Sequence, residues 1–360
     1  MEIKNFDYFK VGSVFNPIIC RNPVKLQGQK LSIDYPMRLN AMAIDPSKIV
    51  ENNNMKYTPG EVVFSTQIFA EIEIGIISDE KIVVNEEIKD RETVIRHACL
   101  IMKKALGYEG GFQVNIKNYN NLKHCGLGST GCLQAGTAAA INHLFGCPIE
   151  ADILIRYLAQ NYGEEIDHDS FNLNPVQCIG GSAASGLHTG GLLVLAGEST
   201  VILSVDIKED YDVIIGIPDN YVFIDSKCQF DDEKENLDKF MDCGTKYKNE
   251  IAFNMLHYFL PSAINGNLEV VGDVIYDYRY NMGSIQNCSY TYNGMVSLMD
   301  ELSFLKTEKY VDVLSISSVG PAVFAITKNS AKCLEAFKEK DMKIIKTKIN
   351  NGIYKVNYMK

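Results

Sequence analysis

Several common sequence features are absent from this chain of 360 residues. Its ten cysteines include no CxxC pair, which argues against a zinc knuckle and against a thioredoxin-type redox motif. The chain starts with acidic residues, Glu2 and Asp7, where a signal peptide would have a basic region and an apolar run, so we expect no export. The most apolar stretch, residues 190–207, is interrupted by Glu198 and Asp206 and falls short of the roughly 18 apolar residues of a membrane span. We therefore expect a cytoplasmic protein with reduced thiols and no membrane contact.

An excess of basic charge is also missing. The sequence has 35 Lys and Arg against 45 Asp and Glu, for a formal net charge of −10. A surface of this sign repels nucleic acid and anionic lipid, so we expect neither as a partner. A phosphorylated ligand would have to be held locally, with a divalent cation. Hydrophobic residues make up 46% of the chain and charged residues 22%, values typical of a globular protein with one large or two medium domains.

Hydrophobic periodicity predicts a mixture of helices and strands. Strands are expected at residues 31–44, 61–77 and 112–116, in three segments between 190 and 218, and at 311–317 and 322–327. Helices are expected at residues 92–106, 133–145, 150–162, 249–264, 268–281, 293–308 and 329–339, and a hairpin-like pair ends the chain. The polar segment 225–248 is interpreted as a solvated loop or domain boundary rather than as an acidic ligand site. The pattern predicts an α+β fold with two lobes that meet near residue 200.

The loop at residues 126–131, Gly-Leu-Gly-Ser-Thr-Gly, is the first candidate functional segment. Its glycines allow close backbone approach, Ser129 and Thr130 offer hydroxyls, and the following helix points its N-terminal amides and its dipole at the loop. This arrangement is typical of phosphate binding. The loop lacks the Lys of a Walker A motif and the spacing of a Rossmann motif, so neither is indicated. A tight turn that needs glycine for packing alone is the alternative.

Two further segments are rich in small residues. Residues 315–325 form a turn containing Gly320 and Pro321 between two apolar strands, for which an ordinary hairpin is the alternative. Residues 180–191 are too rich in glycine for a plain helix, precede a strand, and could line a cleft.

In this order and spacing, the three segments resemble the GHMP superfamily over about residues 31–330. The resemblance implies a ribosomal-S5-like N-terminal lobe over residues 1–200, a ferredoxin-like C-terminal lobe over residues 201–360, and an active cleft between them. Most members are ATP-dependent small-molecule kinases in which an Asp of the middle segment acts as base or electrostatic partner. Here Ala183 occupies that position and cannot accept a proton. A kinase would need another carboxylate, such as Asp167 or Asp169.

A narrower resemblance is to the β-ribofuranosylaminobenzene 5'-phosphate synthases and the related C-nucleoside synthases, which also lack the kinase Asp. Their Arg-Leu-His-x-x-Leu-x-Asp strand, GLGSGTQ loop, Leu-Pro-Ala segment and SSxGPTVYxI motif are similar to residues 38–45, 126–132, 260–263 and 317–326. The chain departs from these motifs at four places: Asn40 replaces His, Thr130 and Gly131 are swapped, Cys132 replaces Gln, and Ala322 replaces Thr.

This narrower resemblance implies a transferase that joins the ribosyl 5-phosphate of phosphoribosyl diphosphate to a ring carbon of an aromatic carboxylate, with loss of diphosphate and CO2. It implies a phosphate cradle formed by Gly126, Leu127, Gly128, Ser129, Thr130 and Gly131, with Mg²⁺ held at Ser129 and Asp45. Arg38 would contact a carboxylate or phosphate, Asp45 would bind Mg²⁺ or polarise the ring substituent, and His188 would carry a proton. Ser317, Ser318 and Gly320 would close the cleft from the second lobe, and Lys123 and His124 would flank the phosphates.

Plainer roles are open for several of these residues. Asp45, which precedes Pro46, is a common turn former, and Lys123, His124 and His188 are compatible with solvated or satisfied side chains. Cys125 and Cys132 are interpreted as small packing residues rather than nucleophiles.

Three functions remain open from the sequence: a decarboxylating C-ribosyltransferase, an ATP-dependent kinase of a small alcohol or acid, and a ligand-binding relative without turnover. The partners expected are a small phosphorylated substrate and an aromatic acid. The residues do not decide between a monomer and a homodimer.

Overall fold

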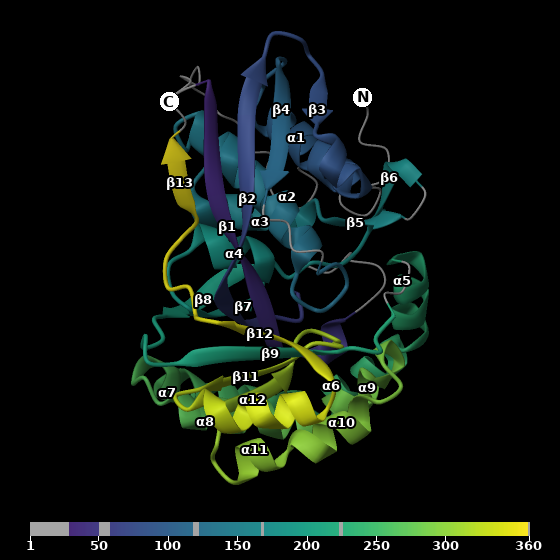
Figure 1. Cartoon of the computed structure of the whole chain (residues 1–360), viewed down its shortest axis with the longest axis vertical. Helices are drawn as coiled ribbons and strands as arrows, with labels where there is room; N and C mark the ends of the chain where they lie inside the picture. Colours follow the sequence, from purple (N-terminus) through teal and green to yellow (C-terminus); the bar gives the residue numbers. More distant parts are fainter. Residues whose placement is uncertain (1–28, 50–57, 118–121, 167–168, 223–225, 359–360) are drawn as a thin grey trace.

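The computed structural model describes residues 29–49, 58–117, 122–166, 169–222 and 226–358 of the chain. Within this part, the strands form a seven-stranded, a four-stranded and a two-stranded sheet. Figure 1 shows the seven-stranded sheet in the upper half of the molecule and the four-stranded sheet across the lower half. The predicted α+β class is confirmed.

The larger sheet is built around two long antiparallel strands, β1 (Lys30–Ala43) and β2 (Glu61–Ile77). The remaining strands of this sheet are β3 (Ile82–Val84), β4 (Gly111–Lys117), β7 (Leu192–Ala196), β8 (Thr200–Val205) and β13 (Lys355–Tyr358), and its main path runs β13-β1-β2-β4-β3. Strand β7 pairs with the start of β2 and with β8. The bounds predicted for the first two strands agree with β1 and β2 to within a residue.

Helices cover one face of this sheet. They are α1 (Glu92–Leu106), α2 (Ser129–Leu144), α3 (Ala151–Gln160) and α4 (Gly181–Leu187). Helices α2 and α4 pack on β1 and β2, while α1 packs on α2 and α3 packs on α4. The Ala-rich sequence of α2 suits this central place, because nearly all of its side chains are buried. A short pair, β5 (Gly163–Ile166) and β6 (Asp169–Pro175), lies beside these helices.

Three of the strands in the four-stranded sheet are buried on both faces, and the fourth forms a more exposed edge. The order of this sheet is β10-β11-β9-β12, formed by β9 (Asp212–Pro218), β10 (Val313–Ile316), β11 (Val323–Thr327) and β12 (Met342–Thr347). Successive side chains of a strand point to opposite faces. Accordingly, Phe324 packs with Phe64 of β2 in the core shared with the larger sheet, whereas Val323 and Ala325 pack in a second core against the helices. The two halves of the molecule therefore share one continuous core.

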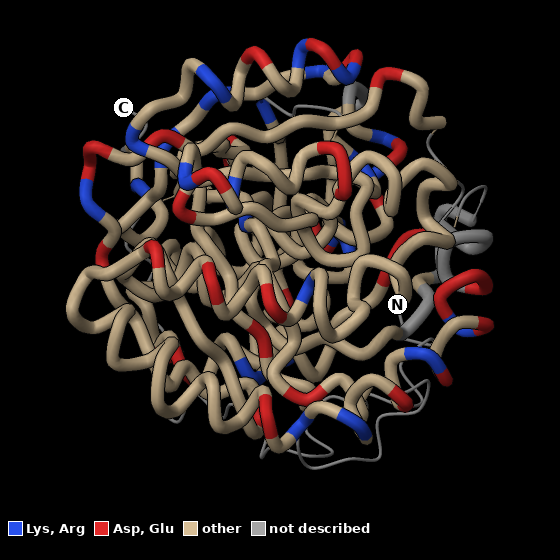
Figure 2. The backbone as a smooth tube through the Cα atoms, turned by 90° about the horizontal axis from the view of Figure 1, so that it is seen from below, with Lys and Arg blue, Asp and Glu red and all other residues tan. Residues whose placement is uncertain are grey.

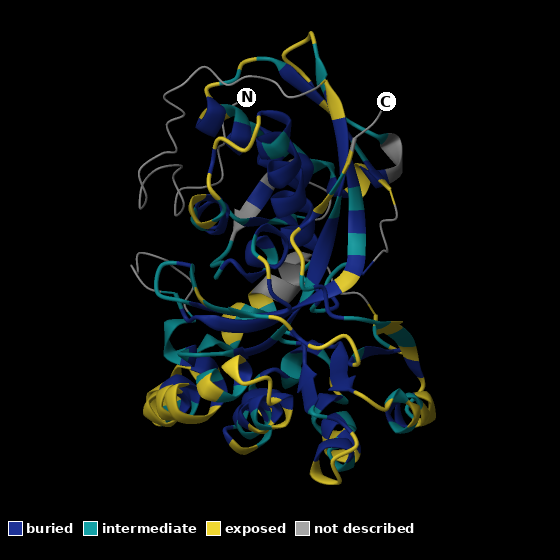
Figure 3. Cartoon of the chain, turned by 90° about the vertical axis from the view of Figure 1, so that its left-hand side faces the viewer, coloured by how far each residue is buried: buried dark blue, intermediate teal, exposed yellow. Residues whose placement is uncertain are grey.

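The second half of the molecule contains the remaining helices, most of which lie on the outer side or at the edges of the four-stranded sheet with their exposed residues facing away from it (Figure 3). These are α5 (Ser226–Glu235), α6 (Leu237–Asn254), α7 (Leu260–Ile264), α8 (Leu268–Tyr276), α9 (Ser284–Asn287), α10 (Met295–Leu302), α11 (Phe304–Thr307) and α12 (Ser330–Glu339). Short 3-10 or π turns occur in both halves of the molecule: η1 (Pro46–Lys48), η2 (Glu86–Arg91), η3 (Met255–Phe259), η4 (Asp277–Asn281) and η5 (Ser289–Thr291).

Three local predictions are wrong. Residues 225–248, expected to be a loop, lie largely in α5 and α6, and residues 181–187, expected to be too rich in glycine for a helix, form α4. The expected C-terminal hairpin does not form, because β12 pairs with β9 whereas β13 pairs with β1 in the other sheet. These segments depend on partners that lie far away in the sequence.

The charges are spread over the molecule. Figure 2 shows acidic and basic positions interspersed around the outline of the chain. Among the described residues, no helix is both long enough and apolar enough to cross a membrane.

Candidate active site

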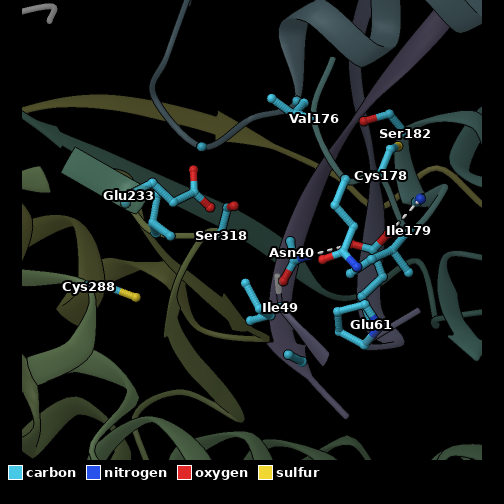
Figure 4. A pocket seen from close by; sticks show the side chains of 18 of the residues that line it. Asn40, Ile49, Glu61, Val176, Cys178, Ile179, Ser182, Glu233, Cys288 and Ser318 are labelled. Carbon is cyan, nitrogen blue, oxygen red and sulfur yellow. Dashed lines mark hydrogen bonds between the residues drawn. The ribbon is translucent and has the colours of Figure 1, made fainter. Parts of the chain in front are cut away.

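A pocket of about 300 Å³ lies where the two halves of the molecule meet (Figure 4). Its walls come from the ends of β1 and β2, from the loop before α2, from β5, and from the segment leading into α4. The second half of the molecule contributes α5, η4 and the β10–β11 loop. In Figure 4, Glu233 and Ser318 are drawn on one side of the pocket, and Glu61, Cys178 and Ser182 on the other.

The glycine loop leads into the first turn of α2 at the pocket wall. Gly128 has φ +66° and precedes Ser129, the first helical residue. Gly126, Gly128, Ser129 and Thr130 all line the pocket. The first amides of a helix lack intrahelical acceptors, so this end of α2 offers backbone donors to an anion in the pocket. The hydroxyl of Ser129 makes no hydrogen bond within the described residues.

The three segments singled out in the sequence interlock at this loop. The Ser317 hydroxyl donates to the Gly126 carbonyl over 2.7 Å and accepts the Asn40 N–H over 3.0 Å. The Ser318 N–H donates to the Asn40 carbonyl over 2.8 Å. These contacts join β1, the phosphate loop and the β10–β11 turn, which come from both halves of the chain. The loop is therefore fixed by backbone and hydroxyl contacts rather than by its own sequence alone.

Arg38 places a positive charge at the pocket side of the loop. Its Nη1 donates to the Gly126 carbonyl over 3.0 Å, and its guanidinium packs against Gly128, where an added Cβ would lie 3.2 Å from Nε. The buried Nε has no hydrogen-bond partner among the described residues. The pairing of β1 with β2 shifts register just before Arg38 and just after Asn40. These irregularities turn Arg38 and Asn40 to the pocket. Arg38 is thus available to an anion held by the loop.

Glu61 places a buried carboxylate beside Arg38. It is the first residue of β2 and is only 3% exposed. Its Oε1 accepts the Gly181 N–H over 2.6 Å, and its Oε2 accepts the side-chain N–H of Asn40. Burial raises the pKa of the Glu61 carboxyl, and the Arg38 charge and the two hydrogen bonds oppose that rise.

Two more carboxylates line the pocket from other elements. Glu164 on β5 accepts the Tyr162 hydroxyl at one oxygen, while its other oxygen is buried without a partner in the described part of the chain. Glu233 on α5 lines the same pocket. Burial, together with the nearby Glu164 charge, raises the pKa of Glu233 to about 7. The His124 imidazole also lines the pocket, and burial lowers its pKa against the opposing effect of Glu164.

Behind the loop, a buried network fixes the first turn of α2. The fully buried Arg91 donates to the Thr130 hydroxyl over 2.7 Å and pairs with Glu165 on β5. Thr130 in turn donates to Glu165 over 3.1 Å. The Thr130 hydroxyl is therefore engaged in holding α1, α2 and β5 together.

Arg279 of η4 forms part of the opposite wall. It is 2% exposed, and its guanidinium donates to the carbonyls of Ala41, Asn40 and Ile316 and to the hydroxyls of Ser284 and Ser315. These neutral acceptors join β1 to β10 across the two halves. Arg279 lines the pocket and keeps this junction rigid.

The pocket brings together Arg38, Gly126, Gly128, Ser129, Thr130, Ser318 and Gly320 from the predicted site. Leu127 and Gly131 are buried in the same loop and helix, and Ser317 lies behind the pocket wall, where it holds the loop. Lys123 precedes the loop and does not line the pocket. His124, at φ +55°, does line it.

Asp45 and His188 lie apart from this group. Asp45 begins η1, where its carboxylate accepts the Ser47 N–H over 3.1 Å and the Ser47 hydroxyl over 2.5 Å, as a turn former does. His188 follows α4 with its Nε2 3.5 Å from an Asp152 oxygen. Neither residue lines the pocket.

The carboxylates were the main residues that sequence reasoning missed. Glu61 opens an alternating strand and Glu164 lies in a short one, and neither belongs to a motif. Glu233 lies within the acidic run for which an acidic ligand site was the less favoured alternative. Of the carboxylates suggested to replace position 183, Asp167 lies outside the described residues and Asp169 begins β6. Ala183 itself is buried in α4 and its carbonyl accepts the Tyr35 hydroxyl.

Mg²⁺ would be held here with few protein ligands. Among the described residues there is no group of three or more His, Cys, Asp or Glu arranged as a metal site. Mg²⁺ commonly needs only one or two carboxylates when substrate phosphates supply other ligands. The unpartnered Glu164 oxygen and the Ser129 hydroxyl, both at the pocket, fit that requirement.

Comparison with known proteins agrees with this geometry. Residues 92–171, which include the loop and α2, match the GHMP kinases N terminal domain. The structure of homoserine kinase from Cytophaga hutchinsonii matches with a TM-score of 0.62 at 13% identity, covering 92% of this chain and 99% of that one. The chain has the GHMP kinase fold.

Two other solved structures share this fold. Galactokinase from Lactococcus lactis, complexed with galactose, matches with a TM-score of 0.62 at 13% identity over 90% of this chain and 94% of that one. Mevalonate kinase from L. major, in complex with R-mevalonate, matches with a TM-score of 0.59 at 10% identity over 92% and 99%. No curated protein matches the sequence. The superfamily fold expected from the three segments is confirmed; the narrower synthase branch stays a prediction.

Proposed function

We propose that the pocket binds ATP with Mg²⁺ and transfers the γ-phosphoryl group to an oxygen of a small molecule. The observation that carries this proposal is that one pocket of about 300 Å³ contains both an anion-binding helix end and three carboxylates, Glu61, Glu164 and Glu233. A kinase needs both, because it must neutralise the phosphates and accept the proton of the attacking hydroxyl. The fold shared with kinases of homoserine, galactose and mevalonate supports the same conclusion.

In this proposal, each pocket residue has a separate role in binding the phosphates or in the transfer. The amides at the start of α2 and the Ser129 hydroxyl face the phosphates, and Arg38 adds a guanidinium to them. Mg²⁺, held by Ser129 and Glu164 together with phosphate oxygens, would neutralise charge on the leaving diphosphate. In the transfer, a bond forms between the acceptor oxygen and the γ-phosphorus, the bond from that phosphorus to the bridging oxygen breaks, and ADP leaves. The hydroxyl proton passes to a pocket carboxylate.

The decarboxylating ribosyltransferase is the second candidate. Ala183, in place of the family's Asp, favours it, and a cradle for the phosphates of ATP would also accept the diphosphate of phosphoribosyl diphosphate. Against it, the carboxylate that a kinase requires is supplied from elsewhere in the pocket. The ATP-dependent kinase therefore has the stronger support.

The test is ADP formation from Mg·ATP in the presence of homoserine, galactose, mevalonate and simple hydroxy acids. We expect one class of acceptor to raise the rate of ADP release above that with Mg·ATP alone. Ser129→Ala should weaken Mg·ATP binding about 10- to 100-fold, because it removes a hydrogen bond to a charged group. Ser297→Ala on the exposed side of α10 is the control and should leave binding unchanged. Phosphoribosyl diphosphate cleavage without ADP formation would contradict the proposal.

A further inference from the structure

The segment leading into α4 poses a chemical problem for a kinase, because Ala183 cannot act as a base. The structure places another carboxylate at this point. Glu61 reaches from the start of β2 to the backbone of Gly181, two residues before Ala183, and accepts its N–H over 2.6 Å. The fit is close: an added Cβ at Gly181 would lie 2.5 Å from the Glu61 Oε1. Glycine at position 181 therefore makes room for a carboxylate from β2.

Glu61 differs from the other pocket carboxylates in its surroundings. Glu164 accepts the Tyr162 hydroxyl and has a free oxygen suited to a metal ion, and Glu233 lies close to Glu164 in charge interaction. Glu61 instead interacts with Arg38, whose guanidinium holds the Gly126 carbonyl of the phosphate loop. A carboxylate, a guanidinium and the phosphate loop thus follow one another along a single wall. This is the order in which an acceptor hydroxyl, a transferring phosphoryl group and a nucleotide would lie.

We propose that Glu61 is the catalytic carboxylate of this pocket and that Arg38 is its cationic partner at the transferring phosphoryl group. The inference rests on the proposed kinase function. Glu61 takes the proton from the acceptor hydroxyl as the oxygen bonds to the γ-phosphorus, and Arg38 contacts the phosphoryl oxygens through its unpartnered Nε. Asn40 and Gly181 hold the carboxylate in place, each through one hydrogen bond, and leave further lone pairs for the substrate.

The environment of Glu61 suits a base. Burial raises the pKa of the Glu61 carboxyl, which makes the carboxylate a stronger base, and the charge of Arg38 on β1 opposes that rise. Cys178, before α4, is the other titratable group in charge interaction with it. The turnover rate should therefore rise with pH as Glu61 loses its proton.

The test is Glu61→Gln, which keeps an oxygen for the Gly181 N–H and nearly the same shape. We expect kcat for ADP formation to fall about 10²- to 10⁴-fold, with KM for Mg·ATP changed less than about twofold and the acid limb of the pH profile lost. Mg·ATP alone, with water as acceptor, serves as the probe where no organic acceptor is known. Glu73→Gln is the matched control, since Glu73 is a buried carboxylate of the same strand that pairs with Lys117 away from the pocket. It should leave kcat unchanged.

The outcomes separate this inference from the proposed function. A wild-type protein that forms no ADP from Mg·ATP, with or without an acceptor, overturns both. If the wild type turns over and Glu61→Gln retains that turnover, the assignment of Glu61 is wrong but the proposed kinase function stands. The same conclusion follows if Glu233→Gln abolishes turnover and Glu61→Gln does not. If thermal unfolding shows that Glu61→Gln does not fold, Glu61→Asp replaces it. The shorter carboxylate should keep the acid limb and lower kcat about tenfold, and an unchanged kcat would overturn the assignment.

Discussion

Gly126 lies at the point where the phosphate loop touches the second half of the molecule. Its φ is +85°, and an added Cβ would overlap the backbone carbonyl of Ser317, which cannot rotate away as a side chain would. The Ser317 hydroxyl also donates to the Gly126 carbonyl. The residue therefore needs both the backbone freedom and the small size of glycine.

Gly126→Ala should displace the loop and weaken Mg·ATP binding at least about tenfold. Gly107→Ala is the matched control, because Gly107 also has positive φ, +61°, but has nothing within 4 Å of the added Cβ. The control should lose about 1–2 kcal/mol of stability from the left-handed backbone and no affinity. Titration calorimetry and urea unfolding of both variants check this prediction, and equal loss of affinity in the two would refute it.

Glu233 should make stability depend on pH. In the folded chain its pKa is about 7, raised by burial and by Glu164, whereas an unfolded Glu titrates near about 4.3. Between these two pKa values the folded state keeps a proton that the unfolded state has lost. The contribution of Glu233 to the free energy of unfolding therefore falls as the pH rises, and the loss is complete above about pH 7.

Glu233→Gln should therefore be more stable than the wild type at pH 8, and the gain should be smaller at pH 5. Urea midpoints measured without Mg²⁺ at the two pH values provide the test. Glu235→Gln, on an exposed position of the same helix, is the control and should show no such pH-dependent gain. The same gain at both pH values would show that Glu233 does not titrate as described.

At the scale of elements, the start of α1, the first turn of α2 and β5 are joined by Arg91, Thr130 and Glu165. Arg91 is 0% exposed and Glu165 is 4% exposed. Removing one of the two charges would therefore leave the other charge buried without its partner. An uncompensated buried charge typically costs about 3–5 kcal/mol, while replacing both charges with apolar residues is often neutral.

Arg91→Met should thus lower the free energy of unfolding by about 3–5 kcal/mol, and Arg91→Met with Glu165→Met should recover most of that loss. A double-mutant cycle measured by urea unfolding gives the coupling. Additive losses from the two single changes would mean that the pair does not act as a unit.

The elements predicted correctly are those whose pattern is complete within the segment. Helix α1 has a continuous apolar face and ends at Gly107, so its bounds, Glu92–Leu106, follow from the sequence. Helix α4 was missed because its small residues make room for side chains from other elements. Gly186 lies against the Tyr35 ring, and Gly181 lies against Glu61. Residues 237–248 of helix α6 were missed because few of their side chains are buried, and Gly244 packs against the backbone of Ser47 in η1.

At the scale of the whole molecule, the C-terminal segment returns to the first sheet after β12. Strand β13 pairs with the start of β1, Tyr354 stacks on Tyr35, and the Tyr354 N–H donates to the Gly186 carbonyl. Adjacent sequence predicted a hairpin here, but these partners are about 170–330 residues away in the chain. Pairing over such distances leaves no local signal.

In the candidate site, too, the residues within local motifs were predicted and those brought in by distant contacts were not. The loop, Arg38 and the late Ser-Ser-x-Gly-Pro turn were found because each belongs to a recognisable motif, and the structure places them in or behind one pocket. Glu61, Glu164 and Arg279 belong to no motif. Glu61 reaches the pocket through the pairing of β1 with β2, Glu164 through the β5–β6 pair, and Arg279 through the packing of the two halves. The sequence shows that position 183 lacks the family's Asp, and the fold brings Glu61 to the backbone two residues before it, where we propose that it acts as the base.

The central claim, that this pocket serves ATP-dependent phosphoryl transfer, is tested most directly by titrating the protein with ATP and with phosphoribosyl diphosphate, each with Mg²⁺, in a calorimeter. We predict that Mg·ATP binds at least about tenfold more tightly than the ribosyl donor and that Ser129→Ala weakens Mg·ATP binding about 10- to 100-fold. Tighter binding of phosphoribosyl diphosphate, with weak or absent binding of ATP, would contradict the kinase and favour ribosyl transfer.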